Sequence, residues 1–217
     1  MVFTPAKLAC LVFLSGFGTA AAQTYPPVGT TFTYQVTAVE TLADGSPRQI
    51  AQDLEKIQIL AVKDRVIYYT VCRQSQPICA VMQSDLIYGQ TFEVVTPGRD
   101  DPKRLIEAAH QHYLETIPHD PGAIFPLRSG KTIEWRKSIL RRATVALRCC
   151  APRASWGDEP LWILSILARD GNGSIRESEQ LYDPSLGWIV SETTRTTSED
   201  LSAVTTKSRL VDVVPPA

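Results

Sequence analysis

The sequence lacks any apolar run long enough to cross a membrane as a helix. The run nearest the N-terminus, residues 8–17, holds about ten residues, whereas a spanning helix needs roughly 20. Lys7 precedes this run, and three alanines ending at Ala22 follow it. A charged start, a short apolar run and an A-x-A sequence are typical of a secretory signal peptide. We therefore expect cleavage after Ala22, a periplasmic or secreted mature protein, and no transmembrane segment after cleavage.

The chain also lacks a strong net charge and any recognised catalytic or cofactor motif. Its formal net charge of -1 argues against general nucleic-acid binding. No G-x-S-x-G elbow, Walker loop or H-E-x-x-H sequence is present. We therefore predict no catalytic residue and no cofactor, and we favour a non-enzymatic protein over an unrecognised hydrolase.

Metal ligands are scarce as well. His110 and His112 fall on a predicted helix, where they point about 200° apart at 100° per residue and cannot share a metal ion. His119 follows the predicted end of that helix. Residues 170–173 (DGNG) begin like a calcium loop, but the glycine and the acid that such a loop needs at its sixth and twelfth positions are missing. We predict a hairpin turn there and no metal site.

Cysteine is present in small number, and its placement is informative. An even count after signal cleavage favours disulfides in an oxidising compartment. Cys72 and Cys79 flank a polar turn between two apolar runs, so we predict a disulfide across a hairpin. The adjacent Cys149 and Cys150 then have three alternatives: a vicinal ring, free thiols, or separate pairing with the other two cysteines.

The rest of the sequence is dominated by β-strand chemistry. Alternating, β-branched and aromatic residues predict strands along most of the chain. The predicted strands are 31–42, the second half of 48–62, 65–73, 78–83, 86–95, 131–138, 141–149, 160–169, 174–182, 187–196 and 203–214. Strands at this density, with turns about every ten residues, predict a mainly β fold with a curved antiparallel sheet or half-barrel.

One segment has helical character and separates two β halves. Asp101 and Pro102 supply an N-cap and a first-turn proline, and an apolar face recurs to about Ile117. The expected organisation is a signal peptide at 1–22, an N-terminal β half at 23–98, a helix and connector at 99–127, and a C-terminal β half at 128–217. Residues 29–34 (GTTFTY) resemble 130–135 (GKTIEW), which is consistent with two related halves. We expect the helix to cover a concave sheet face between them.

Two candidate binding surfaces follow from the strand pattern. Aromatic residues on predicted strands would line an apolar ligand cavity: Phe32, Tyr34, Tyr69 and Trp135. A basic band, Arg136, Arg142 and Arg148, forms a candidate anion-binding face, because alternation places the last two opposite the apolar side of strand 141–149. Arginine forks match phosphate and carboxylate oxygens, so an anionic envelope component or another envelope protein would be the partner. The alternative is a solvated face paired with the acids of the C-terminal strands, Glu177, Glu179 and Glu192.

A family resemblance rests on two groups of residues. The first is 125–127 (FPL) followed by 130–132 (GKT) and Trp135, and the second is 181–184 (LYDP) followed by 186–190 (LGWIV). Over about residues 125–195 the chain resembles uncharacterised bacterial periplasmic β-sheet proteins, some of which are similar in architecture to half-barrel lipoprotein carriers of the envelope. The resemblance implies a fold class and a bacterial envelope, and no catalytic residue.

We expect a non-enzymatic binding or scaffold protein of the cell envelope. The alternative is a carrier that holds an apolar ligand between sheet and helix. An apolar cavity would favour the carrier, and a filled core with a clustered arginine face would favour the scaffold.

Overall fold

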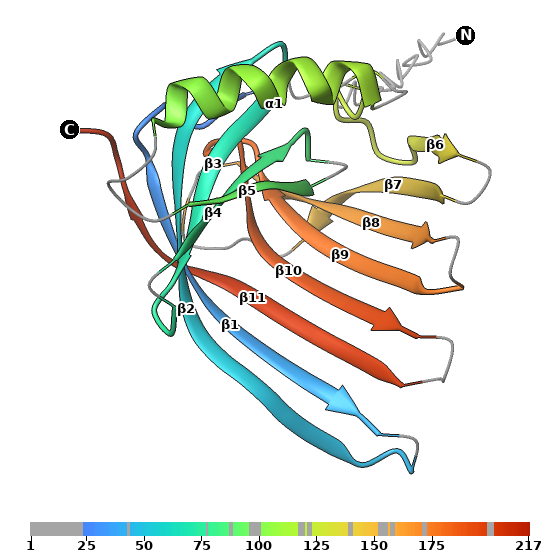
Figure 1. The fold of residues 1–217 in the computed structure, drawn as a ribbon. Helices are drawn as coiled ribbons and strands as arrows, with labels where there is room; N and C mark the ends of the chain where they lie inside the picture. The colour runs from blue at the N-terminus through green and yellow to red at the C-terminus, as the bar shows by residue number, and fades with distance from the viewer. Residues whose placement is uncertain are drawn as a thin grey trace, which may run out of the picture.

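The structure is a computed structural model that describes residues 24–42, 44–76, 78–86, 89–95, 101–116, 120, 123–138, 141–151, 156, 159–170, 173–198 and 202–217. The expected signal peptide and His119 lie outside these residues. The described chain forms eleven strands and a helix (Figure 1). The elements are β1 (Thr31–Thr41), β2 (Pro47–Lys63), β3 (Val66–Arg73), β4 (Cys79–Ser84), β5 (Gly89–Val95), α1 (Pro102–Thr116), β6 (Thr132–Ser138), β7 (Arg141–Ala151), β8 (Leu161–Arg169), β9 (Ile175–Asp183), β10 (Trp188–Thr197) and β11 (Ala203–Val214).

All the strands belong to one antiparallel sheet, in the order β5-β4-β3-β2-β1-β11-β10-β9-β8-β7-β6. The first and last strands pair in the middle of the sheet, and β5 and β6 are its two edges. Figure 1 shows the sheet curling strongly without closing, so that the edges do not pair with each other. The predicted mainly β fold with a curved antiparallel sheet is confirmed.

Strand β2 is longer than the sequence indicates. Ile50 and Leu54 have a spacing that also suits a helix face, and only the second half of 48–62 was predicted as a strand. In the structure the first half pairs with β1, with Thr41 opposite Pro47 and Gln35 opposite Leu54. These residues are largely exposed. Pairing with a neighbouring strand therefore decides the conformation, because their own side chains bury little.

Helix α1 lies on the outer face of the sheet, and the expectation that it covers a concave face is wrong. Neighbouring residues of β3 point to opposite faces. Ile67 and Tyr69 join the core inside the curled sheet, whereas Val66 and Tyr68 contact the helix. The helix contributes three buried residues to this second cluster, Ile106, Ala109 and Tyr113. Both faces of β3 carry apolar residues. The sequence pattern therefore did not reveal which face the helix would cover.

Polar contacts also hold the helix on the outer face. Nδ1 of His110 is 2.8 Å from the Tyr68 hydroxyl oxygen, and its Nε2 is 2.9 Å from Oδ2 of Asp64. Lys63 pairs with Glu107 beside them. At the start of the helix, Oδ1 of Asp101 accepts a hydrogen bond from the Lys103 amide at 3.0 Å, which is the predicted N-cap. His110 thus joins the helix to the β2–β3 hairpin.

The two similar sequence motifs form the same turn at the start of β1 and of β6. The Gly29 amide donates to the Ile59 carbonyl at 2.8 Å, and the Gly130 amide donates to the Leu147 carbonyl at 2.9 Å. In return, the Ile59 amide donates to the Thr30 carbonyl and the Leu147 amide donates to the Lys131 carbonyl, both at 2.9 Å. Both glycines have positive φ, of 93° and 83°. The resemblance in sequence is therefore matched by equivalent hydrogen bonds in the two halves of the sheet.

The predicted Cys72–Cys79 disulfide is present. The two residues are register partners on β3 and β4, with their Cα atoms 4.3 Å apart. They lie on the outer face in a small cluster with Val81, Val95 and Leu105 of the helix. The adjacent Cys149 and Cys150, near the end of β7, are joined to each other, which is the first of the three alternatives.

Candidate functional site

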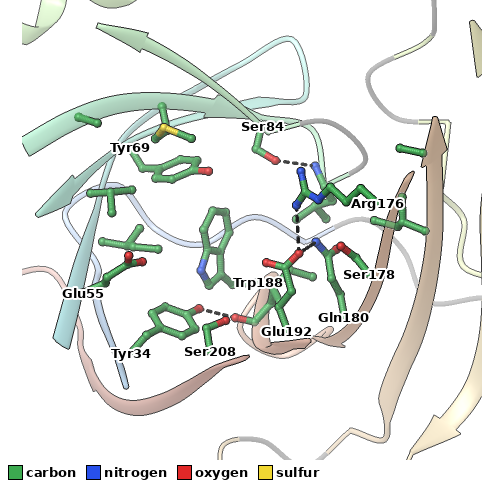
Figure 2. Close-up of a pocket in the computed structure, with 18 of the residues that line it drawn as sticks. Tyr34, Glu55, Tyr69, Ser84, Arg176, Ser178, Gln180, Trp188, Glu192 and Ser208 are labelled. Carbon is green, nitrogen blue, oxygen red and sulfur yellow. Dashed lines mark hydrogen bonds and ion pairs between the residues drawn. The ribbon is translucent and has the colours of Figure 1, made fainter. Parts of the chain in front are cut away.

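The inner face of the curled sheet lines a half-open cavity of about 800 Å³. Strands β3 and β4 form one wall, and β8, β9 and β10 form the opposite wall (Figure 2). This volume lies within the range of about 300–1,000 Å³ that is typical of sites for small molecules. The alternation along each strand decides which residues line the cavity, because only every second side chain points inward.

Three aromatic rings form a stacked group at the cavity. The Trp188 ring lies parallel to that of Phe32, with centroids 5.6 Å apart, and edge-on to that of Tyr69, with centroids 5.3 Å apart. Phe32 is fully buried behind Trp188, whereas Trp188 and Tyr69 line the cavity. Tyr34 lines it beside them, and its hydroxyl donates to the Ile189 carbonyl. The group presents a large, rigid apolar surface to anything in the cavity.

Part of the predicted aromatic set is therefore brought together. Phe32, Tyr34 and Tyr69 lie in one cluster. Trp135 belongs to the edge strand β6, and its side chain lies outside the described residues. The tryptophan that meets the other three is Trp188, which the sequence analysis quoted in a motif but did not assign to the cavity. The apolar start of strand 187–196 indicated that Trp188 is buried. The proximity of Trp188 to β1 and β3, however, depends on pairing between strands that are distant in the sequence.

A polar network covers the wall formed by β9 and β10. Oε1 of Glu192 accepts hydrogen bonds from three side chains: Nη2 of Arg176 at 3.3 Å, Nε2 of Gln180 at 3.1 Å, and the Thr194 hydroxyl at 2.9 Å. The Ser178 and Thr194 hydroxyl oxygens are 2.7 Å apart. Figure 2 shows the contacts of Arg176 and Gln180 with Glu192 beside the Trp188 ring. Within the described chain, the buried Oε1 of Gln180 has no hydrogen-bond partner.

The opposite wall carries a second ion pair. Nε of Arg73 on β3 lies 2.7 Å from Oε1 of Glu55 on β2. Burial raises the pKa of the Tyr69 hydroxyl, and the charges of Glu192 and Glu55 raise it further. Burial also raises the pKa of the Tyr34 hydroxyl well above its ordinary value. Both phenols are therefore neutral at ordinary pH, and the charges of the cavity come from its arginines and acids.

The sequence analysis missed most of this polar network. Arg176, Ser178 and Gln180 alternate along β9 and share its inner face, which the sequence pattern allows. Glu177 and Glu179, the acids that the sequence pattern singled out on this strand, are exposed on the outer face. Glu192 was considered only as a partner for surface arginines, whereas it faces the cavity. The pattern reveals which residues share a face, but it does not reveal which face is enclosed.

The predicted basic band does not form one site. Alternation along β7 is as predicted, with Ala143, Val145 and Leu147 buried and Arg142 and Arg148 exposed. Arg148 is six residues from Arg142 along the strand, which corresponds to roughly 20 Å. Arg148 pairs with Glu179 at 3.6 Å on the outer face. Arg136 is the register partner of Arg142, although its own side chain lies outside the described residues.

Comparison with known protein families gives no match to this sequence, and comparison with curated proteins gives none either. Within the described ranges, no helix has the length and apolar character that crossing a membrane requires. The same ranges contain no group of three or more His, Cys, Asp or Glu residues placed to hold a metal ion.

Proposed function

We propose that this protein is an exported binding protein that holds an amphipathic molecule in the cavity inside its curled sheet. The observation that carries the proposal is the cavity of about 800 Å³ with two kinds of wall. Aromatic rings line one part, and the ion pairs Arg73–Glu55 and Arg176–Glu192 line another. A site with a large apolar surface and a few converging polar groups is characteristic of small-molecule binding.

The cavity does not lie where the carrier hypothesis placed its ligand. That hypothesis placed an apolar ligand between sheet and helix. Helix α1 contacts the outer face, where Ala109 and Tyr113 are fully buried, so this interface is already filled. The open space lies on the other side of β3, next to Tyr69. The ligand would therefore be enclosed by the sheet alone, and the scaffold hypothesis, which expects a filled interior, is the weaker of the two.

Export is part of the proposal and rests on the charged start, the short apolar run and the alanines before Gln23. The full chain would be produced in a bacterium with its own N-terminus and purified from the periplasmic fraction. We expect the mature protein to begin at Gln23 and to release a bound amphipathic molecule on denaturation, which mass spectrometry would detect. An intact Met1 on protein from the cytoplasmic fraction would contradict export.

Binding in the cavity is tested with a pair of matched substitutions. Ala168 on β8 lines the cavity, whereas Ala146 on β7 does not. Ala168→Trp would fill the space, and Ala146→Trp would add the same ring elsewhere. With uncharged dodecyl maltoside below its critical micelle concentration, we expect calorimetric binding to wild type and to Ala146→Trp, and loss of binding by Ala168→Trp. Equal binding by the two variants would mean that the molecule binds elsewhere.

A further inference from the structure

The outer face of the sheet carries a group of exposed cations on strands β7 to β11. On β7, Val145 and Leu147 are buried on the inner face, so the arginines that alternate with them point outward. Residues directly opposite each other on neighbouring strands share a face, which extends the group across the sheet. Its members, here called the outer basic surface, are Arg142, Arg148, Arg169, Arg195, Lys207 and Arg209.

The acids of this face offset only part of its positive charge. Glu177 is the register partner of Arg195, and Glu179 pairs with Arg148 at 3.6 Å. Asp212, opposite a threonine of β1, is a third acid on the outer face. Over the described side chains of β7 to β11, these six cations and three acids leave an excess of three positive charges. The formal net charge of the whole chain is -1, so this face is clearly more positive than the molecule as a whole.

Arg142 and Arg169 are the least compensated members of the surface. They are register partners, and directly opposite residues have Cβ atoms about 5 Å apart, so their like charges destabilise the sheet. Their diagonal neighbours on the same face, Thr144 and Leu167, carry no charge. Leu167 is 37% exposed, so an apolar side chain lies on the surface beside the two arginines. An anionic partner would offset the repulsion between them.

The spacing of the cations favours an extended anionic surface over a small anion. Arg142 and Arg148 are separated by six residues of strand, roughly 20 Å, and five strands at about 4.8 Å spacing cover a similar width. The cations therefore do not converge on one point, as binding of a single phosphate group requires. They can attract a charged surface jointly, because charges interact over a Debye length of about 10 Å at 0.1 M salt.

We propose that the outer basic surface docks this protein on an anionic lipid bilayer. Lysine and arginine side chains near such a bilayer each add to the binding, and salt weakens the attraction. The inference goes beyond the proposed function and does not depend on it, because the two sites use opposite faces of the same strands. On β8, Ala168 lines the cavity and its neighbour Arg169 points outward. Docking would place the cavity beside a membrane, where amphipathic molecules are concentrated.

Sedimentation of the purified mature protein with lipid vesicles tests the docking. One set of vesicles contains phosphatidylcholine alone, and the other also contains about one-third phosphatidylglycerol, which is anionic. At about 0.1 M salt we expect at least about tenfold stronger binding to the anionic vesicles. At about 1 M salt, where the Debye length is about 3 Å, this binding should be lost. Equal binding to both sets, or binding that salt does not weaken, would overturn the proposal.

A matched pair of double variants locates the docking surface. Arg142→Gln with Arg169→Gln removes two of its cations and should weaken binding to anionic vesicles about tenfold. Its melting temperature should not fall, since a repulsive pair is removed. Lys103→Gln with Arg104→Gln removes two exposed cations from α1, which packs against β3, and should bind as wild type does. An equal loss in the two variants would show that net charge alone is responsible, and would overturn the assignment to this surface.

Two further measurements distinguish the surface from other ways of binding. Ala168→Trp, which fills the cavity, should bind anionic vesicles as wild type does. Loss of vesicle binding in this variant would mean that lipid is held in the cavity, and would overturn docking through the outer face. Dextran sulfate is the probe for a soluble anionic polymer. Binding to dextran sulfate without binding to anionic vesicles would assign the surface to such a polymer and overturn the lipid partner.

Discussion

Gly187 is held in a position that no other residue type fits. It ends the turn between β9 and β10 with a φ of 65°. A Cβ atom there would lie 2.7 Å from the carbonyl oxygen of Thr24 and 2.9 Å from the carbonyl carbon of Tyr25. The same Thr24 oxygen accepts a hydrogen bond from the Tyr182 hydroxyl at 3.3 Å. The glycine therefore allows the start of the described chain to pack against the turn that positions Trp188.

Replacing Gly187 and a control glycine by alanine distinguishes two effects on stability, the close contact with Thr24 and the strain of a positive φ. Gly45 is the matched control, since its φ is 82° but nothing lies within 4 Å of an added Cβ atom. The left-handed conformation disfavours a residue with a Cβ by roughly 1–2 kcal/mol. We expect Gly45→Ala to lower the free energy of unfolding by about that amount and Gly187→Ala to lower it clearly further, as measured by urea denaturation. Equal losses would show that the contact with Thr24 contributes nothing.

At the scale of secondary structure, α1 is a separate layer on the outside of the sheet. Ile106 points into the interface with β3 and is 5% exposed, whereas Leu114 on the same helix is 46% exposed. The helix packs against Val66 and Tyr68 and, through Leu105, against the cluster of Cys79, Val81 and Val95. None of the described helix residues lines the cavity. The helix therefore stabilises the β2–β3 hairpin from behind without forming part of the site.

Two truncations in the helix test this packing. Ile106→Ala should lower the free energy of unfolding by about 2–5 kcal/mol, the range for large buried aliphatic residues cut to alanine. Leu114→Ala should change it by no more than about 0.5 kcal/mol, since surface substitutions have small effects. Urea denaturation measures both. Binding of dodecyl maltoside should be retained by folded Ile106→Ala. A large loss of stability in Leu114→Ala would contradict the described orientation of the helix.

At the scale of the whole molecule, the curled sheet keeps several tyrosines from ionising. Burial raises the pKa of the Tyr34, Tyr68, Tyr69 and Tyr182 hydroxyls above their ordinary value of 10.0. These residues lie on both faces, with Tyr68 toward the helix and Tyr69 toward the cavity. The folded state therefore favours the neutral phenol at several places in the molecule.

The consequence for stability has a definite sign. Below pH 10.0, folded and unfolded chains both keep these phenols neutral, so the contribution to stability is complete. As the pH rises above that value the unfolded chain loses its protons first, and stability falls. Ultraviolet titration of tyrosinate should show that at least these four of the seven tyrosines ionise only above pH 10.0, together with unfolding. Ionisation of all seven at pH 10.0 in a protein that stays folded would contradict the enclosed positions.

Local patterns in the sequence determined where the strands, the helix and the Cys72–Cys79 disulfide lie. Strand alternation, turn residues and an N-cap act between residues a few positions apart, so they can be recognised without a partner. They also determined that Arg142 and Val145 point to opposite faces of β7. The extent of β2 was less certain, because its first half is exposed and is held by pairing with β1.

Only the tertiary structure decided which face of the sheet is enclosed. Apolar residues occupy both faces of β3, so alternation could not place α1 on the outer face or the cavity on the inner one. The same ambiguity left Trp188 and the Arg176–Glu192 pair out of the predicted site. Their meeting with Tyr69 depends on the order of the strands and on the curl of the whole sheet. Both properties arise from contacts between residues far apart in the chain, which no local pattern records.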